Sequence, residues 1–352
     1  MKQRIVIMAG GTGGHVFPAL AVAQELELRG WEVSWLGTRK GLESRVVPAN
    51  GIEMDWLAVE GIRGKGWLTK FTAGFKLIQA CWQARKILKQ RQPAVVLGMG
   101  GFVAGPGGLM AKSLGIPLVI HEQNRVPGTT NKLLVKLAAS KVLQAFPDSF
   151  AASVLAIATG NPLRKAFAGL PERLVWDQKR DLHVLVVGGS QGAQVLNQQV
   201  PPALADLDNI VVKHQTGAVM QAEVAADYQQ RGQAAEVVAF IDDMTAAYQW
   251  ADLIICRAGA MTVSEVAACG LPAIFVPLQN AIDDHQTANA NYLAEANAAI
   301  VIKQSELNTA SLRQAIETTK NQLAAMSQAA SSMAKPMATQ LVAEYCIAEA
   351  KL

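Results

Sequence analysis

The first residues suited to chemistry lie in a glycine-rich segment near the start of the chain. An apolar run at residues 5–8 is followed by glycines at positions 10, 11, 13 and 14, and then by His15 and Pro18. Glycines allow a sharp turn and close approach to a ligand. A helix that begins at such a turn presents free backbone N–H groups to an anion. The pattern predicts a strand, a phosphate-binding turn and a helix with Pro18 in its first turn.

This arrangement occurs again in the second half of the chain. Apolar residues 184–187 precede Gly-Gly-Ser-Gln-Gly at 188–192, which aligns with Gly-Gly-Thr-Gly-Gly at 10–14. A third glycine loop, residues 98–101, follows an apolar run at 95–97. The repetition predicts two similar α/β domains, each opening with strand, glycine turn and helix.

Other polar residues follow predicted strands, at the edge where parallel sheets bind ligands. His121-Glu122-Gln123-Asn124 follows residues 118–120, and Asp283-Asp284-His285-Gln286 follows residues 273–276. Either group could instead cap a helix. Glu265 follows the strand 252–256 and is predicted in the first turn of a helix. The helix dipole alone would favour a carboxylate there, whereas the functional interpretation is a bond to a ribose diol.

The elements needed to hold these residues alternate along the chain. Apolar runs and helical periodicity predict strands at 4–9, 32–36, 52–59, 94–98, 117–120, 140–144, 182–187, 209–213, 236–239, 252–256, 272–276 and 299–302. Helices are predicted at 16–29, 41–49, 69–91, 104–114, 128–138, 192–205, 218–231, 244–250, 262–268, 285–297, 309–325 and 337–350. This alternation predicts two doubly wound, Rossmann-like parallel-sheet domains facing a cleft. The predicted boundaries are 1–161, with a C-terminal helix at about 337–352 returning to the first domain, and 162–336.

Residues 61–91 contain eight Lys and Arg residues and no acid. The candidates for membrane contact are the bulky apolar residues Trp67, Phe71, Phe75, Ile78 and Trp82 and the basic residues Lys70, Lys76 and Arg85. Four of these apolar side chains share one helical face, as in helices that lie in a membrane interface. The alternative is that this face packs on the sheet. Nucleic acid is less well supported, because no nucleic-acid-binding module is recognisable.

Composition narrows the class of protein. The four cysteines are scattered, which argues against a disulfide framework or zinc site and fits a reducing cytosol. The chain enters a strand at once, so no signal peptide is expected, and no segment reads as a spanning helix.

The two halves of the chain differ in charge. Residues 1–161 carry 19 Lys and Arg against 9 Asp and Glu, whereas residues 162–352 carry 13 against 19. The first half is therefore expected to meet an anionic surface or substrate.

Several chemistries are excluded by missing motifs. The dinucleotide fingerprint fails, because Val16 occupies its third glycine position and no acid ends the second predicted strand. No P-loop, zinc-protease or nucleophile-elbow motif occurs. Two domains with glycine loops at their ligand edges suit a nucleotide-sugar glycosyltransferase, whose leaving pyrophosphate can be stabilised by N–H groups and an arginine. No metal site or obligatory cofactor is predicted, and dependence on divalent ions is left open.

The motifs together resemble the MurG family of peptidoglycan-precursor N-acetylglucosaminyltransferases. The matching segments, in chain order, are 10–18, 98–102, 121–124, 160–162, 188–192 and 260–265. The resemblance implies the GT-B architecture and inverting transfer of GlcNAc from UDP-GlcNAc to the MurNAc 4-hydroxyl of lipid I, giving lipid II. It also implies a peripheral enzyme on the cytoplasmic face of the bacterial inner membrane, at an anionic surface and beside cell-wall synthesis proteins.

The resemblance assigns roles to individual residues. His15 is the candidate base, since an imidazole suits proton transfer near neutral pH, and Glu122 is the lesser candidate; His15 could instead only shape its loop. The residues expected to bind the donor are Thr12, Gly13, Gly14, Asn124, Arg164, Ser190, Ile241, Ala260, Met261, Thr262, Val263, Ser264, Glu265 and Gln286. The acceptor pyrophosphate is assigned to Gly13, Gly14, Gly100 and Gly101.

The sequence departs from the pattern of the family it resembles at two positions. Arg125 and Asn280 stand where the family frequently has other residues, and Arg125 lies beside the proposed sugar pocket.

Two other functions remain as alternatives to the transferase. A UDP-GlcNAc 2-epimerase would share the architecture and the donor but act without an acceptor. A non-catalytic UDP-sugar-binding protein would bind the donor without turnover. Dependence on the acceptor discriminates among the three.

Overall fold

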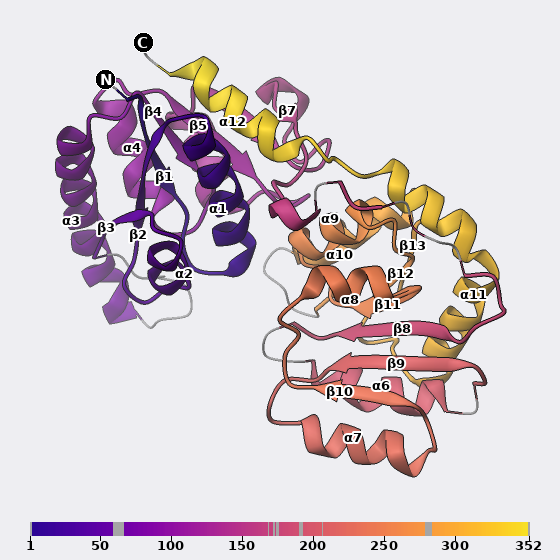
Figure 1. Cartoon of the computed structure of the whole chain (residues 1–352). Coiled ribbons are helices and arrows are strands. Elements are labelled where there is room, and N and C mark those ends of the chain that lie inside the picture. The colour runs from indigo at the N-terminus through magenta and orange to yellow at the C-terminus, as the bar shows by residue number, and fades with distance from the viewer. Residues whose placement is uncertain are drawn as a thin grey trace. The chain divides into compact units, whose positions relative to one another are not determined.

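The structure of the chain is a computed structural model. It describes residues 2–58, 67–167, 169–171, 173, 176–189, 193–205, 207–278 and 284–350. Within the helix at 67–91, side chains are described from residue 76 onward. The chain forms two compact units, Met1–Lys165 with Met337–Leu352 and Ala166–Pro336. Each unit is a parallel sheet with helices on both faces (Figure 1), which confirms the predicted fold class.

The first unit contains a seven-stranded parallel sheet in the order β3-β2-β1-β4-β5-β6-β7. Its elements are β1 (Arg4–Met8), α1 (Gly13–Leu28), β2 (Glu32–Gly37), α2 (Glu43–Ala49), β3 (Glu53–Trp56), α3 (Trp67–Arg91), β4 (Val95–Gly98), α4 (Ala104–Ser113), β5 (Leu118–Glu122), α5 (Thr129–Leu137), β6 (Lys141–Gln144), β7 (Ile157–Ala158) and α12 (Ala338–Glu349). Strand order reverses between β1 and β4, which is where such sheets bind ligands.

The sequence of β1 shows why the sheet has two covered faces. Successive strand residues point to opposite faces. Ile5 and Ile7 pack with α1 and with Val342 of α12, whereas Val6 and Met8 pack on the opposite side with α3 and α4. An uninterrupted apolar run therefore fills two cores. The C-terminal helix α12 packs on α1, although it follows the whole second unit in the chain.

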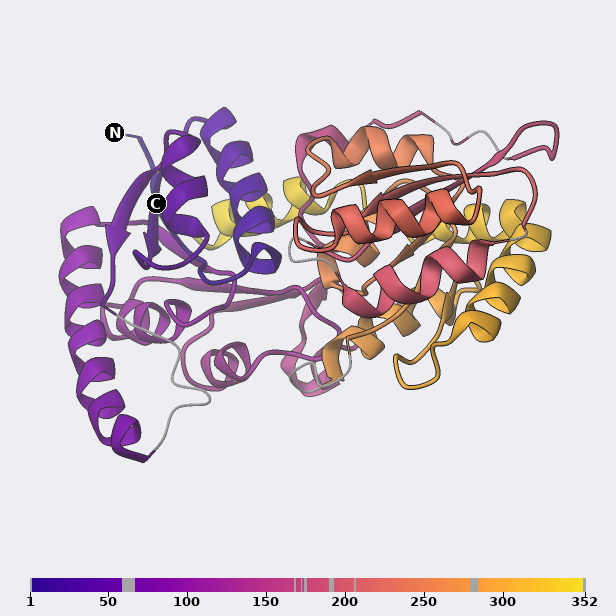
Figure 2. The same ribbon diagram turned by 90° about the horizontal axis from the view of Figure 1, so that it is seen from below.

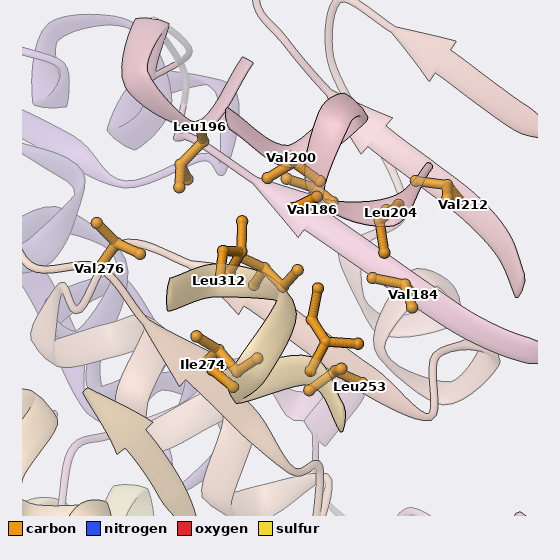
Figure 3. Close-up of a cluster of buried hydrophobic side chains, with 14 of the residues drawn as sticks. Val184, Val186, Leu196, Val200, Leu204, Val212, Leu253, Ile274, Val276 and Leu312 are labelled. Atoms are coloured by element: carbon orange, nitrogen blue, oxygen red, sulfur yellow. The ribbon is translucent and has the colours of Figure 1, made fainter. Parts of the chain in front are cut away.

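The second unit contains a six-stranded parallel sheet in the order β10-β9-β8-β11-β12-β13. Its elements are β8 (Leu182–Val187), α6 (Gln194–Leu204), β9 (Ile210–Gln215), α7 (Gln221–Gln230), β10 (Ala235–Val238), α8 (Met244–Trp250), β11 (Leu253–Cys256), α9 (Ala260–Ala268), β12 (Ala273–Phe275), α10 (His285–Ala294), β13 (Ala299–Val301) and α11 (Thr309–Ser332). Val184 and Val186 of β8 meet Leu196 of α6 and Leu312 of α11 in the core shown in Figure 3. The reversal point here lies between β8 and β11.

The helix α3 packs on α4 and runs along the outside of its unit, as Figures 1 and 2 show. Its buried residues are Ala80, Ala84 and Leu88, one face at a spacing of four. Ile78 and Trp82, on the face that the sequence singled out, are 59% and 71% exposed. The alternative that this face packs on the sheet is therefore wrong for these two side chains. Trp67, Lys70, Phe71 and Phe75 lie in α3, but their side chains are outside the described residues.

Several predicted boundaries need correction. The helix α1 begins at Gly13 rather than 16, so Pro18 lies beyond its first turn, and α9 begins at Ala260 rather than 262. Glu265 is consequently the sixth residue of α9 and lies outside the turn in which the dipole acts strongly. The helix α11 continues to Ser332 instead of ending near 325, because no glycine or proline interrupts it. The short strand β7 was not predicted.

Candidate functional site

In the first unit, the glycine turns after β1 and β4 pack closely together. Gly101 has φ of +80°, and a Cβ there would lie 2.4 Å from the carbonyl oxygen of Gly10. Gly100 has φ of +98°, and its Cβ would lie 3.0 Å from Cε1 of His15. Both positions require glycine for conformation and for space. The structure therefore brings the predicted residues of segments 10–15 and 100–101 to one place, at the reversal point of the sheet.

Thr12, Gly13 and Gly14 form the N-terminus of α1, with Thr12 as its extended N-cap residue. The N–H groups of a helix's first turn lack intrahelical partners. His15 follows them in that same turn and is half-buried. The candidate base and a potential anion site thus share one helical turn.

A buried carboxylate that the sequence did not single out holds the first glycine turn. Glu43 of α2 is fully buried. Its Oε2 accepts a bond from the N–H of Gly11 at 3.0 Å, and its Oε1 accepts from the N–H and hydroxyl of Thr38 at 3.0 and 2.7 Å. From sequence, Glu43 is an ordinary acid in the first turn of a helix. Its contact with Gly11 arises only when β1 and β2 pair.

His15 is the first member of a chain of hydrogen bonds into the unit. Its Nδ1 lies 2.8 Å from Oε1 of Gln123. Nε2 of Gln123 lies 3.0 Å from Nδ1 of His121, and Nε2 of His121 lies 3.0 Å from the carbonyl oxygen of Gly160. Gln123 and His121 are fully buried. Burial lowers the pKa of His121 to about 4, so this ring is neutral near pH 7.

The carboxylate of Glu122 is buried and points to its own loop. Oε1 accepts from the backbone N–H of Asn124 at 2.9 Å, and Oε2 accepts from the N–H of Gly128 and the amide of Asn131 at 3.0 and 2.8 Å. These bonds shape the segment after β5, which carries Asn124. Asn124 and Arg125 are half-buried in that segment.

In the second unit, Glu265 of α9 accepts a hydrogen bond from the hydroxyl of Tyr248 at 3.0 Å. Glu265 is half-buried, whereas Tyr248 of α8 is buried. Burial, followed by the charge of Glu265, raises the pKa of Tyr248 well above its usual value. Tyr248 therefore remains a donor and orients the carboxylate. Neither a motif nor a spacing in the sequence identifies Tyr248 for this role.

The other predicted donor residues of this unit lie at the same edge of the sheet. The segment Ala260–Ser264 is the first part of α9, directly after β11. Gln286 lies in α10, which packs on α9, and its Oε1 accepts a bond from the N–H of Leu278 at 2.9 Å. Ile241 is buried between β10 and α8. The structure thus brings Ile241, α9 and Gln286 to the strand ends of one sheet.

Two predicted donor residues, and one residue that departs from the family pattern, are not placed with either group. Arg164 is exposed near the end of the first unit's main segment. Ser190 and Asn280 lie outside the described residues. Gly189, just before Ser190, has φ of +90°, and its carbonyl oxygen accepts a bond from the side-chain amide of Gln215 at 2.8 Å.

The described residues contain neither a helix that could cross a membrane nor a cluster of side chains that could hold a metal ion. None of the helices there combines the length and apolar character needed to cross a bilayer. In the same part of the chain, no group of three or more His, Cys, Asp and Glu side chains could hold a metal ion.

Two doubly wound units, each with a glycine turn at its reversal point, define the architecture of a two-domain glycosyltransferase. Family models agree: the glycosyltransferase family 28 N-terminal domain matches residues 5–143, and the C-terminal domain of that family matches residues 183–342. The chain belongs to glycosyltransferase family 28.

The names of individual relatives specify a reaction, which the family name does not. A UDP-N-acetylglucosamine–N-acetylmuramyl-(pentapeptide) pyrophosphoryl-undecaprenol N-acetylglucosamine transferase of Methylococcus capsulatus is 57% identical, covering 99% of both chains. A transferase of the same name from Shewanella frigidimarina is 48% identical and covers 99% of this chain and 98% of its own. The crystal structure of Acinetobacter baumannii MurG is 41% identical, with a TM-score of 0.85, and covers 98% of this chain and 99% of its own.

Proposed function

We propose that this chain transfers GlcNAc from UDP-GlcNAc to the 4-hydroxyl of MurNAc in lipid I, with inversion, to form lipid II and UDP. The observation that carries the proposal is the 57% identity, over 99% of both chains, to a transferase named for this reaction. The geometry supports it, because a histidine stands at a helix N-terminus between two glycine turns. The function requires a base beside a place for phosphates, and that arrangement supplies both.

In the proposed reaction, His15 takes the proton of the acceptor hydroxyl. The acceptor oxygen forms a bond to C1 of GlcNAc from the face opposite UDP. The bond between C1 and the phosphate oxygen breaks, and UDP leaves with the electron pair. Glu122 is the weaker candidate for the base, because both of its oxygens accept bonds from the loop it shapes. His15 is half-buried beside Gly100, where a substrate hydroxyl can reach it.

We assign the donor to the second unit, with a contribution from the first. Glu265, oriented by Tyr248, is assigned to the ribose diol, and the backbone at Ile241 to the uracil. The N-terminal turn of α9 suits a phosphate, since its N–H groups point out of the helix.

The remaining assignments follow the family resemblance. Arg164 and Ser190 are assigned to the donor phosphates, and Gln286, Asn124 and the turn Thr12–Gly14 to the GlcNAc end. Gly13, Gly14, Gly100 and Gly101 are assigned to the acceptor pyrophosphate, beside His15. The first unit is thus the acceptor domain and the second the donor domain. No metal is assigned to either.

We further propose that the enzyme binds the cytoplasmic face of the inner membrane through α3. Ile78 and Trp82 are exposed there, with Leu77 and Lys76 exposed beside them. Arg85 is only partly available to bind lipid, because its guanidinium donates a hydrogen bond to the hydroxyl of Ser113. An exposed apolar face among lysines fits an anionic lipid surface. Proteins of cell-wall synthesis are the expected neighbours at that surface.

The membrane proposal is tested by co-sedimentation with vesicles of anionic or zwitterionic lipid. Trp82→Ser should weaken binding by about tenfold or more, given about 1.5–3 kcal/mol for burying a large apolar side chain. Leu28→Ser, which removes an exposed leucine on α1, is the matched control and should bind like the parent chain. Equal binding by the two variants would contradict a role for α3.

The transferase proposal is tested with purified protein, labelled UDP-GlcNAc and a lipid I analogue. UDP release and a disaccharide-lipid product should appear only when the analogue is present. Release of UDP with free or epimerised sugar in its absence would instead establish a 2-epimerase. Donor binding without turnover, in the presence of an acceptor that another transferase of this family converts, would indicate a binding protein.

A further inference from the structure

We propose that Gln123 is a positioning residue that fixes the tautomer of His15, placing the proton on Nδ1 and leaving Nε2 to accept one. The tautomer is a property of the chain alone. Only its kinetic consequence rests on the proposed transferase function.

The orientation of the Gln123 amide is set by an atom that can only accept. Its Nε2 lies 3.0 Å from the backbone carbonyl oxygen of His121. A flipped amide would place Oε1 against that carbonyl oxygen, and two acceptors would face each other with no proton between them. The NH2 group must therefore face His121.

His121 supplies a second acceptor that favours the same orientation. Its Nε2 lies 3.0 Å from the carbonyl oxygen of Gly160, so Nε2 carries the proton and donates it. Nδ1 of this neutral ring then has a lone pair, which faces Nε2 of Gln123 at 3.0 Å. The two amide hydrogens of Gln123 thus have two acceptors on one residue. Because the group is fully buried, turning it would deprive Nδ1 of this donor and set Oε1 against the carbonyl oxygen of His121.

With the amide fixed, the tautomer of His15 follows. Oε1 of Gln123 can only accept, and it lies 2.8 Å from Nδ1 of His15. Nδ1 must therefore donate, and the neutral ring keeps its lone pair on Nε2. Gly100 lies beside the ring, since a Cβ there would stand 3.0 Å from Cε1 of His15. Glu122, the acid next to Gln123 in the sequence, directs its carboxylate to Asn124 and Gly128.

The direct test is nitrogen NMR of the full chain labelled at histidine, which contains five such residues. The His15 signals are assigned by their loss in His15→Ala. In the parent chain, above the pH at which the ring protonates, Nδ1 should show a pyrrole-type shift and Nε2 a pyridine-type shift. In Gln123→Met, which lacks the acceptor, the ring should move toward the Nε2–H form that free imidazole side chains prefer.

The control is Gln144→Met. Gln144 is also buried in this sheet, but it bonds only backbone groups, at Phe150 and Ala156. The Gln144→Met variant should lose about as much stability as Gln123→Met, while its His15 signals stay unchanged. An Nε2–H tautomer in the parent chain, or an unchanged tautomer in folded Gln123→Met, would overturn the proposal.

Kinetics separate positioning from structure. Gln123→Met should lower kcat by about 10- to 100-fold, less than the full contribution of a general base, which is about 10²- to 10⁴-fold, with little change in the KM for UDP-GlcNAc. In a His15→Ala background it should cause no further loss, because both changes remove the same function. An equal loss in both backgrounds would contradict the proposal. A parent chain with the expected tautomer but no transferase activity would sink the proposed function and leave the tautomer assignment standing.

Discussion

The two units share a sheet order and a glycine turn, yet they use their polar residues differently. In the first unit, Glu43, Glu122 and Gln123 are buried and bond to loops or to another side chain of the site. In the second unit, Glu265 and Gln286 are half-buried at the sheet edge. In the proposed reaction, the first arrangement fixes the candidate base in place before substrate binds. The second would leave side chains accessible to the donor.

The difference matches what each proposed role requires. A base must be held in one orientation and one tautomer, since small misplacements reduce the rate. A donor site gains affinity when partly exposed groups are covered by the ligand and form charge-assisted bonds. Substitutions in the first unit should therefore act on kcat and stability, and those in the second on the KM of the donor.

The largest expected effect belongs to His15→Ala. Removing a general base should lower kcat by about 10²- to 10⁴-fold, with the donor KM little changed, as measured by UDP release with saturating acceptor. His183→Ala, which removes a histidine stacked on Trp250 in the second unit, is the control and should retain kcat. A His15→Ala enzyme with nearly full kcat would show that this residue only shapes its loop.

Glu43→Gln should have the next largest effect. An amide cannot accept from both Gly11 and Thr38, so one of these two residues loses its acceptor and part of a buried network is broken. The expected loss is about 2–4 kcal/mol in the free energy of unfolding, measured by denaturant titration. Glu32→Gln changes an exposed glutamate of β2 and should cost much less. Similar losses in the free energy of unfolding for the two variants would show that the buried bonds of Glu43 do not stabilise the first unit.

Glu265→Gln should act on the donor. Loss of a charge-assisted bond, worth about 1.5–3 kcal/mol, should raise the KM for UDP-GlcNAc by about 10- to 100-fold with a smaller change in kcat. A donor lacking the ribose 2′-hydroxyl should bind the parent chain more weakly but bind the variant almost as well as UDP-GlcNAc does. If the two donors differed equally in both proteins, Glu265 would not contact the ribose.

Tyr248→Phe should have the smallest effect of the series. It removes one hydrogen bond to Glu265 and leaves the ring packed, so the donor KM should rise only severalfold, for a bond worth about 0.5–1.5 kcal/mol. In the Glu265→Ala background, the same change should leave the donor KM unaltered. A further rise there would mean that Tyr248 acts on the donor independently of Glu265.

Much of the fold follows from local patterns. Strand 182–187 and helix 244–250 agree with the observed β8 and α8 to the residue. Apolar runs, periodicity and glycine turns act within a few residues and remain visible in the sequence. The sequence left open which face of α3 is buried, because Trp82 is more apolar than Ala80 and Ala84. The small side chains face α4, with which α3 packs closely.

The sequence by itself determined two parallel-sheet units and the glycine turns at their ligand edges, because each depends on residues close together in the chain, and its resemblance to a family made His15 the candidate base. Only the tertiary structure decided that Glu43 holds Gly11, that Gln123 meets His15 and that Tyr248 meets Glu265. Those partners are 17 to 108 positions apart. A buried polar group must satisfy its hydrogen bonds with whatever the packed elements place beside it, and that choice is made when the sheets assemble.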